Sequence, residues 1–405
     1  MYGKKLHIRS LFIFVVIALL IASCAQPGAE QGAAPTEAPA PGVQTTTQAQ
    51  ATQPPAQGNA SVSGLPDYYP SDYNQIVDAC KNEKDGLLIY SIMGEKNWAP
   101  VIAAFNQRYP GVEVTALDLG SYEVFERYYS EAAGNARTGD MIITSAPDGW
   151  QDFIAKGDLV EYTSPEDSYL PDWSKLAPGV YTVSSDPMVI IYNKQLVQNP
   201  PDTMAGLADL VKANPDQFKG KITTYDAENV ATGFAINWFW VKKLGDKAWE
   251  ILNTIGDTSP TIQSSAGRMV DATLAGESTI GYFVSTISVF PRFPDAEPVL
   301  GWNFIKDGQP ILVRGMGITK KASSPNCAKL MMDFILSQEG QIKFAEGGLT
   351  PYRPDVADKV DFHLKTIEQE VGADNLIPFS FDPELMDQAK KDAFLAKWKE
   401  ALKIQ

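Results

Sequence analysis

Hydrophobic and polar positions alternate in blocks that predict a β-α-β unit over residues 87–121. Leu87 to Tyr90 is a short apolar run, typical of a parallel strand covered on both faces. Residues 98–109 carry apolar side chains at helical spacing, and Pro110-Gly111 ends that pattern before a second strand begins at Val112. The polar turn at residues 91–96 therefore lies at a strand's carboxyl end and a helix's amino end, where unpaired N–H groups favour an anion. The alternative is a turn that binds nothing.

The same pattern continues to the carboxyl terminus and predicts an α/β protein. Residues 180–193 are strand-rich and long enough to cross between two domains, with a break at Asp186-Pro187. A helix follows residues 264–268 and runs through Ala275. The other predicted helices are 72–84, 123–133, 151–155, 206–212, 233–241, 248–255, 326–344, 363–370 and 384–402. The other predicted strands are 141–144, 221–224, 279–287, 297–305 and 311–318.

The amino terminus has the order of an export signal. Basic residues precede an apolar run from Leu11 to Ala22, and this run of roughly 12 residues is too short for a comfortable membrane span. Residues 1–23 are therefore interpreted as a signal peptide. The sequence from Leu20 to Cys24 resembles a bacterial lipobox, in which the cysteine is acylated and becomes the first mature residue. The alternative is an ordinary signal with an incidental Cys24.

A low-complexity segment follows the cysteine. Residues 24–64 consist almost entirely of Ala, Gln, Pro, Thr and Gly, so they cannot bury a core and are predicted to be a disordered linker. Such a tether would hold a folded body near a membrane surface. A glycosylated stalk is the alternative use of this composition.

The remaining chain, from about residue 65, is large enough for two domains. Without the signal, 31 Lys and Arg oppose 49 Asp and Glu, a net charge of −18. This charge argues against nucleic acid or anionic lipid as a partner. Cys80 and Cys327 lie in helix-like surroundings, and in an exported protein they form either a disulfide or two buried thiols.

Five segments, taken in order, resemble the extracellular solute-binding proteins of bacterial ABC importers, nearest the ferric-iron-type branch. They are Ile89-Tyr90-Ser91, residues 105–111 (FNQRYPG), residues 191–194 (IYNK), residues 315–320 (GMGITK) and residues 333–341 (DFILSQEGQ). The resemblance covers about residues 65–405. It implies a two-domain clamshell of the periplasmic binding protein type 2 class, with two crossing hinge strands. Domain one would comprise 65–187 and 302–405, and domain two 188–301, with the ligand in the cleft between them.

The resemblance also places ligand contacts on loops at the carboxyl ends of strands. In domain one these are Ser91, Met93, Gly94, Ser121, Ser145 and Ala146; in domain two they are Thr232, Gly233, Ser264, Ser265, Arg268, Tyr282 and Phe283. Small hydroxyls and open amides at helix starts suit an oxyanion, and an adjacent arginine can bind it bidentately. The competing interpretations are helix N-caps for the hydroxyl residues, a surface charge for Arg268, and core packing for Tyr282 and Phe283.

The predicted ligand is a small organic or phosphorus oxyanion, with ferric iron or an iron–anion complex as the alternative. The iron-binding branch commonly uses adjacent tyrosines, a carboxylate and a histidine. Here the tyrosine pair is reduced to Tyr282-Phe283, and His363, the one histidine after the signal, lies far along the chain. No metal site and no cofactor are therefore predicted.

The expected partner is an ABC permease, and the protein is expected to be a monomer that is exported and lipid-anchored through Cys24. The sequence carries no nucleophile-elbow, HExxH or P-loop motif, which argues against an enzyme. A sensor ectodomain built on the same clamshell remains an alternative.

Overall fold

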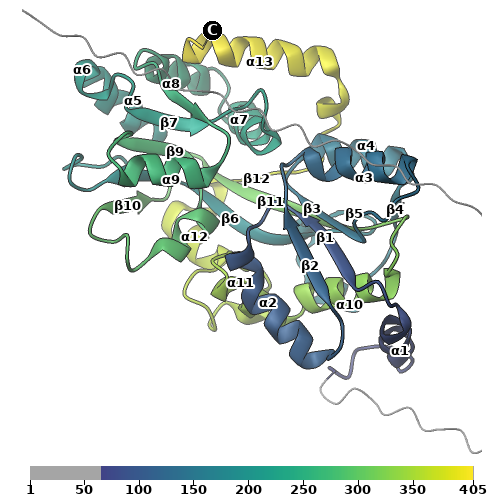
Figure 1. Cartoon of the computed structure of the whole chain (residues 1–405). Coiled ribbons are helices and arrows are strands. Elements are labelled where there is room, and N and C mark those ends of the chain that lie inside the picture. The colour runs from purple at the N-terminus through teal and green to yellow at the C-terminus, as the bar shows by residue number, and fades with distance from the viewer. Residues whose placement is uncertain (1–64, 405) are drawn as a thin grey trace, which may run out of the picture. The chain divides into compact units, whose positions relative to one another are not determined.

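A mixed β-sheet runs through residues 65–404, the part of the chain that this computed structural model describes (Figure 1). Along its main path the strands lie in the order β2, β1, β3, β11, β6, β9, β7, β8. The strands are β1 (Leu87–Ser91), β2 (Val114–Asp118), β3 (Met141–Thr144), β4 (Leu159–Val160), β5 (Lys175–Ala177), β6 (Val180–Asn193), β7 (Ile222–Tyr225), β8 (Thr261–Gln263), β9 (Ile280–Ser285), β10 (Leu300–Asn303), β11 (Gln309–Thr319) and β12 (Leu376–Pro378). The predicted signal peptide, Cys24 and the linker lie outside the described residues.

Two long strands, β6 and β11, join the two ends of this sheet. They pair antiparallel with each other, while β1 pairs parallel with β2 and β3 in what we call the first half of the sheet. In the second half, β7 pairs parallel with β8 and β9. Strand β6 pairs with β11 up to Pro187 and with β9 from Met188 onward, so it passes from one half to the other. The predicted α/β clamshell with two crossing strands is confirmed.

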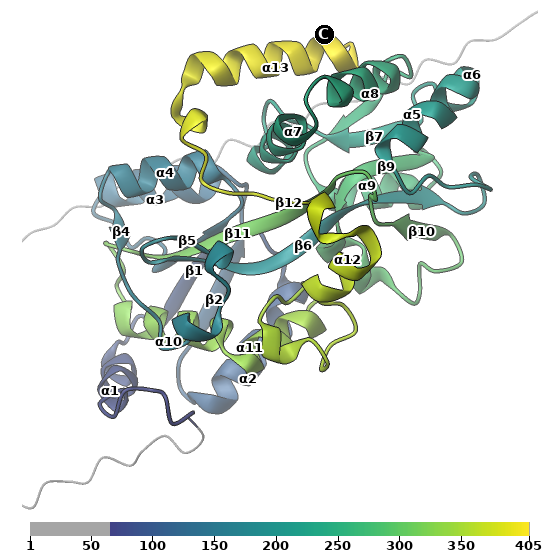
Figure 2. The ribbon, with the colours of Figure 1, turned by 180° about the vertical axis from the view of Figure 1, so that it is seen from behind.

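Helices cover both faces of the sheet. In the first half, α3 and α4 lie on one face and α2 and α10 on the other (Figures 1 and 2). The α-helices are α1 (Asn74–Asn82), α2 (Glu95–Arg108), α3 (Glu123–Ala133), α4 (Pro147–Ala155), α5 (Met204–Ala213), α6 (Pro215–Phe218), α7 (Ala231–Leu244), α8 (Asp246–Gly256), α9 (Ala266–Leu274), α10 (Pro325–Leu336), α11 (Gln338–Glu346), α12 (Leu364–Val371) and α13 (Gln388–Leu402). Within residues 65–404 no helix is long and apolar enough to cross a membrane.

The structure corrects the predicted break in β6. The strand is continuous through Asp186 and Pro187, although proline has no N–H to donate to a neighbouring strand. The break is unnecessary because β6 changes partner at this point, from β11 to β9. Pro187, which lacks an N–H donor, therefore lies at the position where β6 stops pairing with β11 and begins to pair with β9.

The single long helix predicted over 326–344 is also wrong. The structure has two helices, α10 and α11, separated at Ser337, whose backbone is extended. The Ser337 hydroxyl accepts a hydrogen bond from the Gly340 N–H at 3.1 Å and so caps α11. A side chain at Gly340 would lie 1.9 Å from the carbonyl oxygen of Phe334, so this sharp turn needs glycine.

The C-terminal helix α13 packs on helices of the second half. Phe394 lies against the rings of Phe234 and Trp238 in α7 and of Trp249 in α8. The predicted boundaries assign residues 302–405 to domain one. Helix α13 nevertheless packs on α7 and α8 of the second half, so the chain crosses from the first half to the second before α13. The boundaries themselves stay a prediction.

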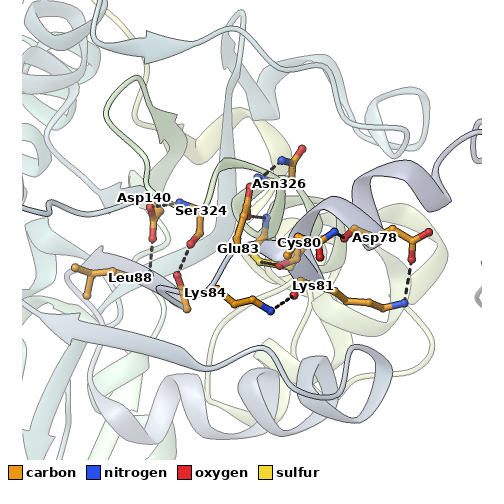
Figure 3. The surroundings of a disulfide bond; sticks show 12 residues. Asp78, Cys80, Lys81, Glu83, Lys84, Leu88, Asp140, Ser324 and Asn326 are labelled. Atoms are coloured by element: carbon orange, nitrogen blue, oxygen red, sulfur yellow. Dashed lines mark hydrogen bonds and ion pairs between the residues drawn. A yellow bond between two sulfur atoms is a disulfide. The ribbon is translucent and has the colours of Figure 1, made fainter. Parts of the chain in front are cut away.

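A disulfide joins Cys80 in α1 to Cys327 in α10, across 247 positions of sequence. Beside it, the Glu83 carboxylate accepts the backbone N–H groups of Asn326 at 3.0 Å and Cys327 at 2.9 Å (Figure 3). Glu83 thereby satisfies N–H groups in the first turn of α10. The sequence left open whether these cysteines form a disulfide or remain two buried thiols, and the structure has the disulfide.

Candidate functional site

A cleft of about 760 Å³ opens where the carboxyl ends of strands from both halves face each other. The first half contributes the turns after β1 and β2, and the second half contributes the loops after β7, β8 and β9. Strand β11 contributes Leu312 and Arg314. Ligands of α/β proteins bind outside the carboxyl ends of strands, and this volume is typical of pockets for small molecules.

Arg314 is the buried cation of this cleft. Its side chain is only 1% exposed and forms an ion pair with Asp186 of β6. The same terminal nitrogen donates to the Ser184 hydroxyl at 3.0 Å, and the other lies 3.3 Å from the Ser285 hydroxyl. The Nε–H of Arg314 has no partner. Since an unpaired buried donor is costly, a ligand that accepts from this atom would be stabilised.

Tyr225, at the end of β7, lies beside this cation and is itself buried. Burial raises the pKa of the Tyr225 hydroxyl to about 12, while the charge of Arg314 and a hydrogen bond from the backbone of Ala266 act in the opposite direction. The hydroxyl is therefore protonated at neutral pH. Because it accepts from Ala266, its own proton remains available to a ligand.

The amino end of α9 completes this corner of the cleft. Ser264, Ser265, Ala266 and Gly267 line it, and the Ser265 hydroxyl caps the helix by accepting from the Arg268 N–H at 3.3 Å. Open amides at a helix start carry a partial positive charge. We call Arg314, Tyr225 and residues 264–267 the donor corner, because all three elements offer hydrogen-bond donors.

The opposite wall is acidic. Glu95, Asp118, Glu123 and Glu126 line the cleft from the first half. Burial raises the pKa of Asp118. The wall therefore carries negative charge, whereas the charge of Arg314 is compensated by Asp186, so the donor corner offers hydrogen-bond donors rather than a net positive charge.

Five of the residues predicted to bind ligand line the cleft: Gly94, Ser121, Thr232, Ser264 and Ser265. Two of these also contact the other half of the sheet. The Thr232 hydroxyl lies 2.6 Å from the Ser145 hydroxyl, and the Ser121 hydroxyl accepts from the Ala231 N–H at 3.1 Å. These small hydroxyl residues therefore join the two halves where α7 begins.

The other predicted residues lie outside the lining: Ser91, Met93, Ser145, Ala146, Gly233, Arg268 and Tyr282. The buried Ser91 hydroxyl accepts from the Trp98 indole N–H at 3.1 Å, which fixes α2 on β1. Gly233 is a packing position, since a side chain there would lie 2.4 Å from the carbonyl oxygen of Asp226. Arg268 is exposed, and Tyr282 is fully buried with an unpaired hydroxyl. Phe283 is also buried, so the core-packing interpretation fits Tyr282 and Phe283.

Sequence reasoning missed Arg314 and Tyr225. A signal for Arg314 was present: it is the one charged residue in β11, the otherwise uncharged strand QPILVRGMGIT. A charged side chain inside a buried strand pattern needs a partner or a ligand. Tyr225 had no comparable signal, because a tyrosine at the end of a strand is usually core.

Among residues 65–404, the group of side chains that could hold a metal ion is Cys80, Glu83 and Cys327. Its two sulfurs form the disulfide, and none of the three lines the cleft. The chemistry of the cleft is therefore that of hydrogen-bond donors, hydroxyls and carboxylates.

A cleft at strand ends, between two half-sheets joined by two crossing strands, defines a clamshell binding protein. The family model of bacterial extracellular solute-binding proteins matches residues 101–369, more than half of the chain, and the chain belongs to that family. The family is one of solute-binding proteins rather than enzymes. Among curated proteins, no sequence relative matches this chain.

Solved structures share the fold at low identity. The substrate-binding protein of an ABC transporter from Agrobacterium tumefaciens is 23% identical, with a TM-score of 0.72 over 80% of this chain and 96% of that one. The fructose-6-phosphate-bound periplasmic protein AfuA from Actinobacillus pleuropneumoniae is 20% identical, with a TM-score of 0.62 over 79% and 99%. Iron-bound HitA from Pseudomonas aeruginosa is 16% identical, with a TM-score of 0.55 over 78% and 97%.

Proposed function

We propose that this protein is the substrate-binding component of an ABC importer, and that it captures a small organic or phosphorus oxyanion in the cleft and delivers it to a membrane permease. Membership of the solute-binding family supports the general role. The similarity to a substrate-binding protein of an ABC transporter supports the importer.

The main support for an anionic ligand is the donor corner. The Nε–H of Arg314 has no acceptor, and the Tyr225 hydroxyl is protonated at neutral pH; both residues are buried and line the cleft. An oxyanion satisfies both donors at once and also benefits from the amino end of α9. The arginine that binds the anion is then Arg314, in place of Arg268 as the sequence predicted.

The experiment is a thermal-shift screen of carboxylates, phosphate esters, phosphonates, sulfonates, cationic solutes and ferric ion, followed by calorimetry on the hits. We expect stabilisation by one class of oxyanion and none by polyamines. Tight binding of free ferric ion without any anion, abolished by Tyr282→Phe, would favour the iron-binding alternative over ours.

The proposal includes a lipid anchor at Cys24 on the outer face of the cell membrane, which lies outside the described residues. The basic, apolar and small-residue order before Cys24 supports it. We expect Cys24→Ala to move the protein from the membrane fraction to the soluble fraction, as measured by immunoblot. Equal retention of the variant in the membrane fraction would contradict the anchor.

The remaining parts of the proposal concern partners. The protein acts as a monomer and binds no nucleic acid, in keeping with its strongly acidic composition. A sensor ectodomain is the alternative of another class. Neighbouring genes for a permease and an ATPase would support import, whereas a neighbouring kinase gene would support sensing.

A further inference from the structure

The C-terminal helix α13 is held mainly by the second half of the sheet. Besides the ring contacts of Phe394 with α7 and α8, Lys399 forms an ion pair with Glu228 in the loop after β7. The packing on α8 is close, since a side chain at Gly256 would lie 2.1 Å from the carbonyl oxygen of Ala401. Figures 1 and 2 both show α13 over α7 and α8, with its first turn toward α3 and α4. We therefore expect α13 to move with the second half.

One side chain of α13 nevertheless reaches the first half. The Lys391 ammonium forms an ion pair with Asp148 in the first turn of α4, and it lies 5.4 Å from the centre of the Phe234 ring in α7. The side chains of Lys391 and Asp148 are 18% and 8% exposed, so solvent screens this pair less than a pair on open surface. Of the ion pairs that α13 forms within residues 65–404, this is the one that reaches the first half.

Asp148 connects this ion pair to the cleft. The carboxylate oxygen that contacts Lys391 also accepts from the Tyr122 hydroxyl at 2.9 Å, and Tyr122 lines the cleft. Burial, together with the charge of Asp148, raises the pKa of the Tyr122 hydroxyl, which therefore stays protonated and donates. The other carboxylate oxygen of Asp148 is buried without a partner. Withdrawal of Lys391 would therefore leave a buried and poorly compensated charge.

Two further polar contacts join the halves beside this pair. The Ser121 hydroxyl accepts from the Ala231 N–H at 3.1 Å, and the Ser145 hydroxyl lies 2.6 Å from the Thr232 hydroxyl. Ser121 and Thr232 also line the cleft, so these contacts form one edge of it. We call the three contacts between the halves the polar seam: Ser121 with Ala231, Ser145 with Thr232, and Asp148 with Lys391.

We propose that the polar seam is a latch that holds the two halves of the sheet together along one edge of the cleft, and that Lys391 of the C-terminal helix closes it. Lys391 is then a positioning residue, because it lies outside the cleft lining and acts on it through Asp148 and Tyr122. Strands β6 and β11 connect the halves, but a hinge leaves their relative orientation free unless other contacts restrict it. The latch does not depend on which solute the cleft binds, so it is tested without a ligand.

The backbone N–H of Ala231 reports on the latch. The first N–H groups of a helix have no acceptor within the helix, so protection of this amide from hydrogen exchange depends on Ser121 across the seam. The amide of Trp240, in the interior of α7, reports on the helix itself. Hydrogen exchange of the whole chain carrying Cys24→Ala, read at single amides, therefore separates opening of the seam from unfolding of α7.

The double variant Lys391→Met/Asp148→Asn removes both charges of the pair, so no unpaired carboxylate remains in the seam. We expect the Ala231 amide to exchange at least about tenfold faster than in the native chain, while Trp240 keeps its native rate. Lys391→Arg keeps the charge and should retain most of the protection. Lys399→Met is the matched control, because it removes a lysine ion pair of the same helix that lies within the second half. Its Ala231 exchange rate should stay close to the native value.

Two results would overturn the latch. Native exchange at Ala231 in the double variant would mean that the crossing strands and the hydroxyl contacts hold the halves without Lys391. Equal acceleration in the double variant and in Lys399→Met would mean that α13 acts through the stability of the second half rather than through the seam. Neither result bears on the proposed function, since no solute is present, and a solute screen without hits would likewise leave the latch standing.

Discussion

The pair formed by Arg314 and Asp186 gives the sharpest test of the proposed site. Replacing Arg314 alone with Gln would leave the carboxylate of Asp186 buried and unpaired, since that side chain is 0% exposed. Breaking a buried pair in this way costs about 3–5 kcal/mol of stability. A loss of binding in the single variant would then be ambiguous, because the site itself could be distorted.

The double variant Arg314→Gln/Asp186→Asn removes both charges together. The amide oxygen of Asn at 186 can still accept the Thr350 N–H, which donates to Asp186 at 2.7 Å in the native protein. We therefore expect the double variant to recover most of the stability lost in the single variant, as measured by urea unfolding.

The double variant should nevertheless bind the solute poorly. A hydrogen bond from a charged donor contributes about 1.5–3 kcal/mol, so loss of the Nε–H of Arg314 should weaken binding roughly ten- to a hundredfold. Calorimetry on the best oxyanion from the screen measures this change. A double variant that is folded and binds within threefold of the native protein would refute the role of Arg314.

A second buried ion pair supplies the matched control. Arg353 and Glu166 are 2% and 0% exposed, pair with each other, and lie outside the cleft lining. The variant Arg353→Gln/Glu166→Gln perturbs stability by the same mechanism without touching the site. Its affinity for the oxyanion should match the native value, and a comparable loss of affinity there would mean that binding reports only on general stability.

Three further predictions follow from individual contacts. Tyr225→Phe removes the second spare donor and should weaken oxyanion binding about tenfold in calorimetry, with little change in the melting temperature. Burial raises the pKa of Asp333 to about 7, although the hydroxyls of Tyr73 and Tyr162 donate to it. The folded protein therefore holds this proton more tightly than the unfolded chain, and stability falls as the pH rises from about 4 to about 7. Between pH 5 and pH 8 the native protein should lose up to about 3 kcal/mol relative to Asp333→Asn in urea unfolding, and parallel curves would contradict this. Replacing both Cys80 and Cys327 with Ala removes a link across 247 positions and should cost about 2–5 kcal/mol, whereas an unchanged unfolding midpoint would show that the bond does not constrain the unfolded chain.

The sequence predicted the fold well where hydrophobic periodicity alone decides the structure. The bounds of α3 and β3 agree with the predicted ranges, because an amphipathic helix and a short apolar strand each carry an unambiguous period. The errors at Pro187 and Ser337 have a different origin. At Pro187 the ladder changes partner, and at Ser337 a hydroxyl cap and the close approach of Gly340 to Phe334 decide the structure. Both features depend on tertiary contacts, which leave no periodic pattern in the sequence.

The candidate site was predicted less completely, and the reason is geometric. The rule that ligands lie at the carboxyl ends of strands selected turns that border the cleft, and Gly94, Ser121, Thr232, Ser264 and Ser265 line it. The rule cannot say which side chain within a turn faces the cleft. Ser91 illustrates this limit, because its hydroxyl turns inward to Trp98.

The position of Arg314 links binding to the crossing strands. The arginine belongs to β11 and its counter-ion Asp186 belongs to β6, so the pair joins the two strands that pass between the halves of the sheet. Asp186 lies one residue before the point where β6 exchanges β11 for β9. Movement of one half relative to the other would bend β6 and β11 near this stretch, because both strands cross between the halves here. A solute that accepts from Arg314 therefore contacts the hinge directly, and it can favour one arrangement of the halves only through its different interaction with each. If the solute is an oxyanion held by Arg314, as we propose, the buried charge in β11 would both recognise the anion and couple its binding to closure of the cleft.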